Sequence, residues 1–495
     1  MQNVRNTARR YMLSRRNLVL SSVFSGSILR ADQASTKSSE ITSLSIESAS
    51  ALLRAKTLSP LDLIRACLSE IERLNPRFNA FITVTADSAL SEAREMEKEL
   101  ARGFWRGPLH GIPFAVKDNI ETAGIRTTAA SAVLENHIPT QDAESVRRLK
   151  QAGAILLGKL NMHEFAYGGT SVISHYGPVR NPWNPAYIAG GSSGGSGCAT
   201  AARMCYFALG TDSGGSVRQP AAYCGVVGLQ PTYGRVSTRG IIAGEWSTDH
   251  IGLLTRTVAD CATVLQAVAG YNPDDPYSAN QSVPSYSELA DSRKLRIGIP
   301  RRQFYSNIHP ELAAATDDAI ARLSRLSAGA MDVDLPAAEP TLRSLEAEGY
   351  SFHEPHLKNT PDLYDPSTRG RISNRASITA AAYLRAREEL VLLRRHVVQV
   401  FRACDVLVTP TLLEEPRTIS DVQTKGYGVS IRNTMPFSYY SLPTVSIPCG
   451  FTKGGIPIGL QISGPPWGEQ LVFTIARAYQ DATDWHKRKP AGIEP

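Results

Sequence analysis

Two stretches rich in glycine and serine, residues 190–197 and 211–220, carry the residue types that acyl transfer requires. Glycine lets a backbone turn adopt positive φ and approach a ligand closely, and successive free N–H groups in such turns form a concave site for negative charge. A serine hydroxyl in the same turns can attack a carbonyl while backbone N–H groups hold the oxyanion. A flexible linker is disfavoured because apolar segments continue on both sides. A phosphate-binding loop is disfavoured because no lysine follows these glycines.

A nucleophilic serine needs a base, and Lys117 is one candidate. It ends the short apolar run 114–116, which has the character of a buried strand. A lysine at such a position is usually a surface residue whose stem packs along apolar neighbours. The alternative is a lysine presented from the end of a sheet into a site, where burial lowers its pKa and lets it act as a base.

The histidines and the other lysines offer competing arrangements. The pattern G-x-S-x-G occurs at 190–194 and again at 191–195, but that motif requires a buried strand directly before it, and residues 183–189 are typical of a loop. The late histidine that such a triad needs would be His486, near a polar end of the chain. No lysine follows a serine at the S-x-x-K spacing. A serine with a remote lysine therefore remains.

Hydrophobic periodicity predicts the elements that position these turns. We expect two helices within 44–74, of which the second begins at Ser59-Pro60 and is stopped by Asn75-Pro76. Residues 336–380 are expected to be irregular. The remaining predicted helices are 86–102, 145–152, 258–269, 310–326, 380–403 and 469–482, and the predicted strands are 78–84, 114–116, 154–158, 295–300, 406–410, 445–448 and 458–462. Their alternation indicates a layered α/β architecture.

Several motifs in the right order resemble the amidase signature family. They are 111–119 (GIPFAVKDN), 158–165 (GKLNMHEF), 190–198 (GGSSGGSGC), 210–221 (GTDSGGSVRQPA), 225–232 (GVVGLQPT) and 454–461 (GGIPIGLQ). The resemblance covers about residues 44–482. It implies an α/β fold made of one catalytic domain over 41–490, with a mixed central β-sheet covered by helices on both faces. This replaces the two to four domains that length alone suggests.

The resemblance also implies a catalytic triad. Ser216 would be the nucleophile, Ser192 would bridge it to Lys117 through a residue with a cis peptide bond, and Lys117 would be the base, neutral at rest. The backbone N–H groups of Ser213, Gly214 and Gly215, together with that of Ser216, would form the oxyanion hole.

Four further polar residues of the two turns receive supporting roles. Asp212 and Arg218 would hold the second turn in place; the alternative is a buried ion pair without chemistry. Ser193 and Ser196 are expected to be turn residues.

The implied reaction is hydrolysis of the C–N bond of a small carboxamide, a linear amide, through an acyl-serine intermediate that releases ammonia or an amine. No cofactor and no metal are implied. Two alternatives stay open: a glutamine-hydrolysing amidotransferase A-type subunit, and a catalytically silent binding subunit on the same fold. A silent subunit should lack a triad residue, and here all three are present.

The chain departs from the family pattern at three places. Ser213 stands where threonine or isoleucine is usual, and Ser438 and Ser441 stand where asparagine and glycine are usual. Residues 371–385 lack the double-arginine pattern typical of the tRNA-dependent amidotransferase subunit, which disfavours a tRNA-dependent role.

Charge and composition limit the partners. Six arginines within residues 1–30, with no acidic residue before Asp32, account for most of the formal net charge of +7, so the rest of the chain is near neutral. A nucleic-acid partner is therefore disfavoured. No apolar run is long enough for a stable membrane anchor, and a homodimer stays open. The seven cysteines are scattered and form no C-x-x-C pair, as expected of small core residues.

Residues 1–40 have the character of a targeting segment that does not belong to the fold. Residues 14–20 (SRRNLVL) resemble a twin-arginine export signal, which predicts a periplasmic protein. The same region is rich in arginine and serine, as organellar transit peptides are. A disordered basic tail on a cytoplasmic protein is the remaining alternative.

Overall fold

The computed structural model describes residues 38–242, 244–426 and 428–493. The twin-arginine-like motif lies outside the described residues, so export stays a prediction. Within the described residues, the chain contacts the core from Ile41 onward, because the hydroxyl of Tyr206 donates to the Ile41 carbonyl. In the same part of the chain, no helix has the length and apolarity needed to cross a bilayer.

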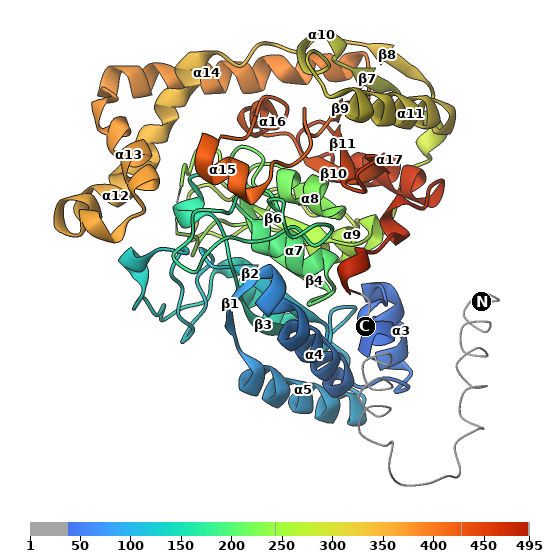
Figure 1. Ribbon diagram of the computed structural model, residues 1–495. Helices are drawn as coiled ribbons and strands as arrows, with labels where there is room; N and C mark the ends of the chain where they lie inside the picture. The colour runs from blue at the N-terminus through green and yellow to red at the C-terminus, as the bar shows by residue number, and fades with distance from the viewer. Residues whose placement is uncertain (1–37, 243, 427, 494–495) are drawn as a thin grey trace.

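An eleven-stranded mixed sheet runs through the molecule in the order β1-β3-β2-β4-β6-β5-β10-β11-β9-β7-β8 (Figure 1). Strand β2 pairs in parallel with β3 and β4, and β7 pairs in parallel with β8 and β9. The other neighbouring strands pair antiparallel. The strands are β1 Phe81–Val84, β2 Pro113–Lys117, β3 Ile155–Leu160, β4 Phe207–Asp212, β5 Val227–Gln230, β6 His250–Thr255, β7 Ile297–Ile299, β8 Ala330–Asp332, β9 Val406–Pro410, β10 Thr444–Phe451 and β11 Pro457–Ser463.

Helices cover both faces of this sheet, which confirms the predicted α/β architecture. Two short helices, α7 and α8, pack on β4, β5, β10 and β11. The helices α9 and α11 both pack against α17, and these three helices together pack on β6, β9 and β10. The helices are α3 Ile46–Arg54, α4 Pro60–Phe78, α5 Ala86–Ala101, α6 Glu144–Gln151, α7 Gly194–Ala201, α8 Arg218–Cys224, α9 Val258–Val268, α10 Arg301–Phe304, α11 Pro310–Leu326, α12 Ala347–Asn359, α13 Pro366–Ser373, α14 Ala380–Val397, α15 Ile419–Lys425, α16 Met435–Tyr440 and α17 Glu469–Asp481.

Close packing of α8 on the sheet places the second glycine-rich turn at the sheet surface. A Cβ at Gly228 of β5 would lie 2.4 Å from the Cβ of Ala221, and a Cβ at Gly459 of β11 would lie 2.5 Å from that of Ala222. Only glycine at these two strand positions lets α8 approach so closely. The turn between β4 and α8 therefore leads into a helix that packs closely against the middle of the sheet.

Two local predictions were wrong. Pro76 does not stop α4, because the helix continues to Phe78 and ends where Asn79 adopts the left-handed conformation. Residues 336–380 are not irregular: they contain α12 and α13 and several 3₁₀ turns. Buried apolar residues such as Tyr364 and Ile372 pack there against Phe165, which lies about 200 positions away in the chain, so their local pattern was uninformative.

All seven cysteines are buried and free, as expected of core residues. The charged helix α14 has a solvated outer surface, on which three apolar side chains are also exposed, Leu384, Val391 and Leu392.

Candidate active site

Lys117 is not a surface lysine: its side chain is fully buried at the carboxyl end of β2. Its Nζ donates to the Oγ of Ser192 at 2.7 Å and to the Oγ1 of Thr211 at 2.7 Å. Burial lowers the pKa of Lys117 from its ordinary value to about 7, although the carboxylates of Asp249 and Asp212 act in the opposite direction. The amine is thus able to lose its proton near neutral pH.

Ser192 lies in the first glycine-rich turn, just before α7, and its peptide bond with Gly191 is cis. Its side chain is fully buried. Its carbonyl accepts from the N–H of His163 at 3.1 Å and from the Oγ of Ser171 at 3.2 Å. The backbone of Ser192 is therefore held from a second loop while its hydroxyl faces Lys117.

Ser216 lies in the second turn, between β4 and α8, and is half-buried. The two turns are joined directly, because the N–H of Ser193 donates to the carbonyl of Ser216 at 3.1 Å. The structure therefore brings Lys117, Ser192 and Ser216 into one region from three separate segments of the chain.

The backbone N–H groups of the second turn differ in whether they already have a hydrogen-bond acceptor. The N–H of Gly215 donates to the Oδ1 of Asp212 at 2.5 Å, so it is already engaged. The N–H groups of Ser213, Gly214 and Ser216 donate to no acceptor among the residues that the structure describes. These three remain available to an oxyanion.

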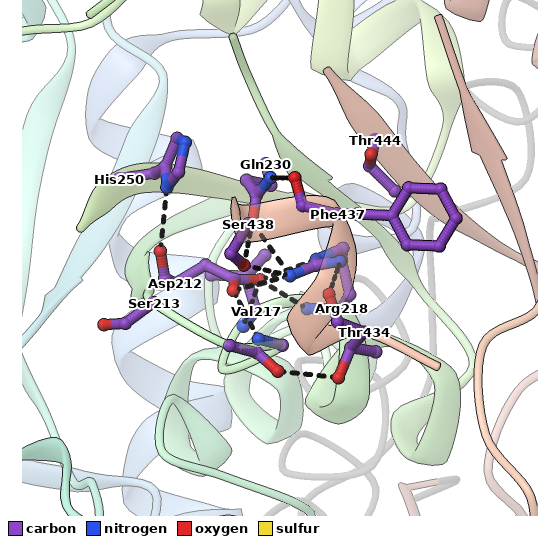
Figure 2. A network of polar contacts seen from close by, with 12 residues as sticks. Asp212, Ser213, Val217, Arg218, Gln230, His250, Thr434, Phe437, Ser438 and Thr444 are labelled. Carbon is purple, nitrogen blue, oxygen red and sulfur yellow. Dashed lines mark hydrogen bonds and ion pairs between the residues drawn. The ribbon is translucent and has the colours of Figure 1, made fainter. Parts of the chain in front are cut away.

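Asp212 and Arg218 form a fully buried ion pair at the base of this turn (Figure 2). The guanidinium donates to both carboxylate oxygens, at 2.9 and 3.0 Å. Burial alone would raise the pKa of Asp212, but the charge and hydrogen bonds of Arg218 and the backbone N–H of Val217 and Gly215 hold it at about 2. Asp212 is therefore a carboxylate at neutral pH, and it fixes the turn.

The remaining donors of Arg218 reach distant segments. They contact the Oε1 atoms of Gln230 and Gln461, the carbonyl of Thr434 and the Oγ of Ser438. Ser438, where the family usually has asparagine, also donates to Gln230 Oε1 at 2.8 Å. This departure therefore lies in the polar network beneath the turn.

Ser193 and Ser196 both donate to backbone carbonyls. Ser193 is a turn residue, as predicted, but Ser196 lies inside α7, so the turn prediction was wrong for Ser196. The Oγ of Ser193 donates to Thr211 O at 3.2 Å and that of Ser196 donates to Leu209 O at 3.1 Å. Among the described residues, no histidine ring forms a hydrogen bond with Ser192, Ser193 or Ser216. The nucleophile-elbow arrangement is therefore absent from this part of the chain.

Sequence reasoning missed three polar residues around the site. Thr211 accepts from Lys117, and Asp249 accepts from the hydroxyl of Ser213. Burial raises the pKa of Asp249. Lys159 is a second fully buried lysine, whose Nζ donates to Ile120 O and to two threonine hydroxyls. Only its position in the GKLNMHEF motif could have drawn attention to it.

The Amidase family matches residues 62–473. The chain belongs to the amidase signature family. The A-type subunit of the glutamyl-tRNA(Gln) amidotransferase from Moorella thermoacetica is 39% identical over 91% of this chain and 99% of its own length. The family relationship confirms the resemblance, and the family chemistry is hydrolysis of amide C–N bonds.

Solved structures share both the fold and part of the sequence with this amidase-signature protein. One is a vestigial protein complex that reveals the evolutionary origins of an s-triazine catabolic enzyme. Its chain has a TM-score of 0.82 and 33% identity, over 89% of this chain and 98% of that one. Another is 6-aminohexanoate cyclic dimer hydrolase with its substrate, with a TM-score of 0.82 and 28% identity, over 92% of this chain and 100% of that one.

Proposed function

We propose that this protein hydrolyses the C–N bond of a small-molecule carboxamide, with Ser216 as nucleophile and Lys117 as base through Ser192. The observation that carries the proposal is the 2.7 Å hydrogen bond between Lys117 Nζ and Ser192 Oγ, made by a fully buried lysine. A lysine that is neutral near physiological pH can accept a proton that a surface lysine cannot.

The first half of the reaction would acylate the enzyme. The Oγ of Ser216 attacks the amide carbon, its proton passes to Ser192, and the proton of Ser192 passes to the neutral Nζ of Lys117. The resulting ammonium returns a proton through Ser192 to the leaving nitrogen. Ammonia or an amine leaves, and an ester of Ser216 remains.

Water would complete the cycle along the same route. It attacks the ester carbon while its proton passes through Ser192 to Lys117. Lys117 then returns a proton to Ser216, and the carboxylic acid is released. No cofactor or metal enters these steps.

Both steps need donors for the oxyanion. Since the N–H of Gly215 is engaged by Asp212, we propose Ser213, Gly214 and Ser216 as the donors. Removal of one such donor typically slows an enzyme by about 10²–10³-fold.

A glutamine-hydrolysing subunit of an amidotransferase is the second candidate. Sequence similarity supports this candidate better than it supports hydrolysis of a simple amide, because the A-type subunit of such an enzyme is 39% identical over nearly the full length of that relative. The reaction at Ser216 would be the same, with glutamine as the amide and a partner that receives the ammonia. The near-neutral body of the chain argues against direct tRNA contact. A homodimer stays a prediction.

The test is ammonia or amine release by the purified chain alone, across aliphatic amides, aryl amides and glutamine, with Ser216→Ala as the control. We expect turnover of a simple amide without a partner, lost in the variant. Ammonia release from glutamine and from no other amide would favour the second candidate. So would ammonia release that begins only after a partner protein is added. Equal turnover by Ser216→Ala would refute both.

A further inference from the structure

A segment far away in the chain closes over the second glycine-rich turn. Thr434, just before α16, is buried, and its Oγ1 donates to the carbonyl of Gly214 at 2.6 Å (Figure 2). Its other contact, with the Ile431 carbonyl, is longer at 3.3 Å. The threonine hydroxyl therefore donates a hydrogen bond to the carbonyl of a residue 220 positions earlier.

The peptide unit between Gly214 and Gly215 is thereby held at both ends. Thr434 holds its carbonyl, and Asp212 accepts from its N–H at 2.5 Å. Arg218 joins the two anchors, because it donates to the carbonyl of Thr434 at 2.8 Å and to the carboxylate of Asp212 at 2.9 Å. A closed ring of hydrogen bonds thus fixes the plane of this one peptide.

The same segment packs directly on the two glycines. A Cβ at Gly214 would lie 2.6 Å from the Sδ of Met435, and a Cβ at Gly215 would overlap the side chain of Thr434. Gly215 also has a φ of +124°, which disfavours other residues. Thr434 therefore lies against the turn with no other side chain between them.

We propose that Thr434 is a positioning residue for the hydrolysis, holding the Gly214–Gly215 peptide so that the N–H groups on either side face the reacting carbonyl. This inference rests on the proposed function. The held peptide is joined through the Cα atoms of Gly214 and Gly215 to the two peptides that carry the N–H groups of Gly214 and Ser216, so a displacement of the held peptide would move both donors. Donors held in advance of the reaction are what give an oxyanion site its effect.

The test compares threonine variants with a matched control. Thr434→Val removes the hydroxyl and keeps the shape, and Thr434→Ser keeps the hydroxyl. Thr316→Val is the control, since Thr316 is a buried threonine of α11 whose hydroxyl donates to the Leu312 carbonyl at 2.7 Å. The readouts are kcat and KM for the amide that is turned over, and the rate at which a fluorophosphonate labels Ser216.

We expect Thr434→Val to lower kcat and the labelling rate by about 10- to 100-fold with little change in KM, because small misplacements of catalytic groups cost rates of this size. Thr434→Ser should keep both rates within a few-fold. Thr316→Val should lose similar stability and keep both rates. Thr434→Ala serves as the second hydroxyl-free variant if the valine variant does not fold.

Two results would overturn the inference. One is unchanged kcat and labelling in a folded hydroxyl-free variant. The other is a raised KM with unchanged kcat, which would make Thr434 a substrate contact instead. Failure of the proposed function itself is recognised separately, because Ser216→Ala would then keep its turnover.

Discussion

The Nζ of Lys117 and the Oγ of Ser192 lie 2.7 Å apart, although 75 residues separate them in the chain. The strand β2 presents the lysine and the first glycine-rich turn presents the serine. Because the lysine is fully buried, this contact joins a titratable amine to a hydroxyl away from water. The protonation state of this one amine should therefore control both the activity and part of the stability of the protein.

Activity should depend on pH through Lys117. The base must be neutral, and burial lowers the pKa of Lys117 to about 7. We therefore expect kcat/KM to fall by about tenfold per pH unit below that value and to level off above it. Rates on one amide measured from about pH 5 to about pH 9 test this. A profile that stays flat through the neutral range would contradict the assignment of Lys117 as base.

Replacement of Lys117 by methionine should abolish turnover without unfolding the protein. General-base catalysis contributes about 10²–10⁴-fold, so a loss of at least this size is expected. Lys159→Met is the control, since Lys159 is buried as deeply but contacts neither Ser192 nor Ser216. It should lose about 1–3 kcal/mol of unfolding free energy through the acceptors left unpaired, yet keep the pH profile of the parent protein.

The pH dependence of stability should differ between the parent protein and Lys117→Met. The folded pKa of Lys117 is lowered to about 7 from an ordinary value of 10.5, so between these values the unfolded chain binds one more proton than the folded one. The free energy of unfolding contributed by this group therefore rises with pH across that window. Urea titrations at several pH values should show a smaller rise in the methionine variant. An identical rise would mean that Lys117 titrates normally.

Arg218→Met should destabilise the protein strongly. It leaves the carboxylate of Asp212 buried without its partner, and breaking such a pair by removing one member costs about 3–5 kcal/mol. Urea unfolding of the single variants Arg218→Met and Asp212→Asn and of the double variant measures the coupling. Additive losses would contradict a shared network. Arg218→Lys should not restore stability, because an ammonium cannot reproduce the fork that contacts both carboxylate oxygens.

A fluorophosphonate should label Ser216 and leave Ser193 unmodified. Ser216 is half-buried, whereas Ser193 is fully buried and its hydroxyl donates to Thr211 O. Mass spectrometry of the labelled peptide identifies the site, and Ser216→Ala should prevent labelling. Modification of Ser193 would instead support the nucleophile-elbow arrangement.

The sequence alone predicted the α/β architecture, many of its helices and strands, and the three residues of the proposed triad. The predicted elements rest on local signals. Ser59 and Pro60 mark the start of α4, and the apolar run before Lys117 marks β2. The glycine-rich turns and the motif order indicated the family and the chemistry. These features depend on residues close to one another in the chain, so they can be recognised without coordinates.

Only the tertiary structure decided which groups surround the reacting atoms. The burial of Lys117 comes from strands and helices packed around it, and its lowered pKa follows from that burial. The hydrogen bond from Thr434 to Gly214 joins residues 220 positions apart, and the engagement of the Gly215 N–H by Asp212 depends on the exact path of the turn. Such contacts arise from long-range packing, which no local pattern of residues records.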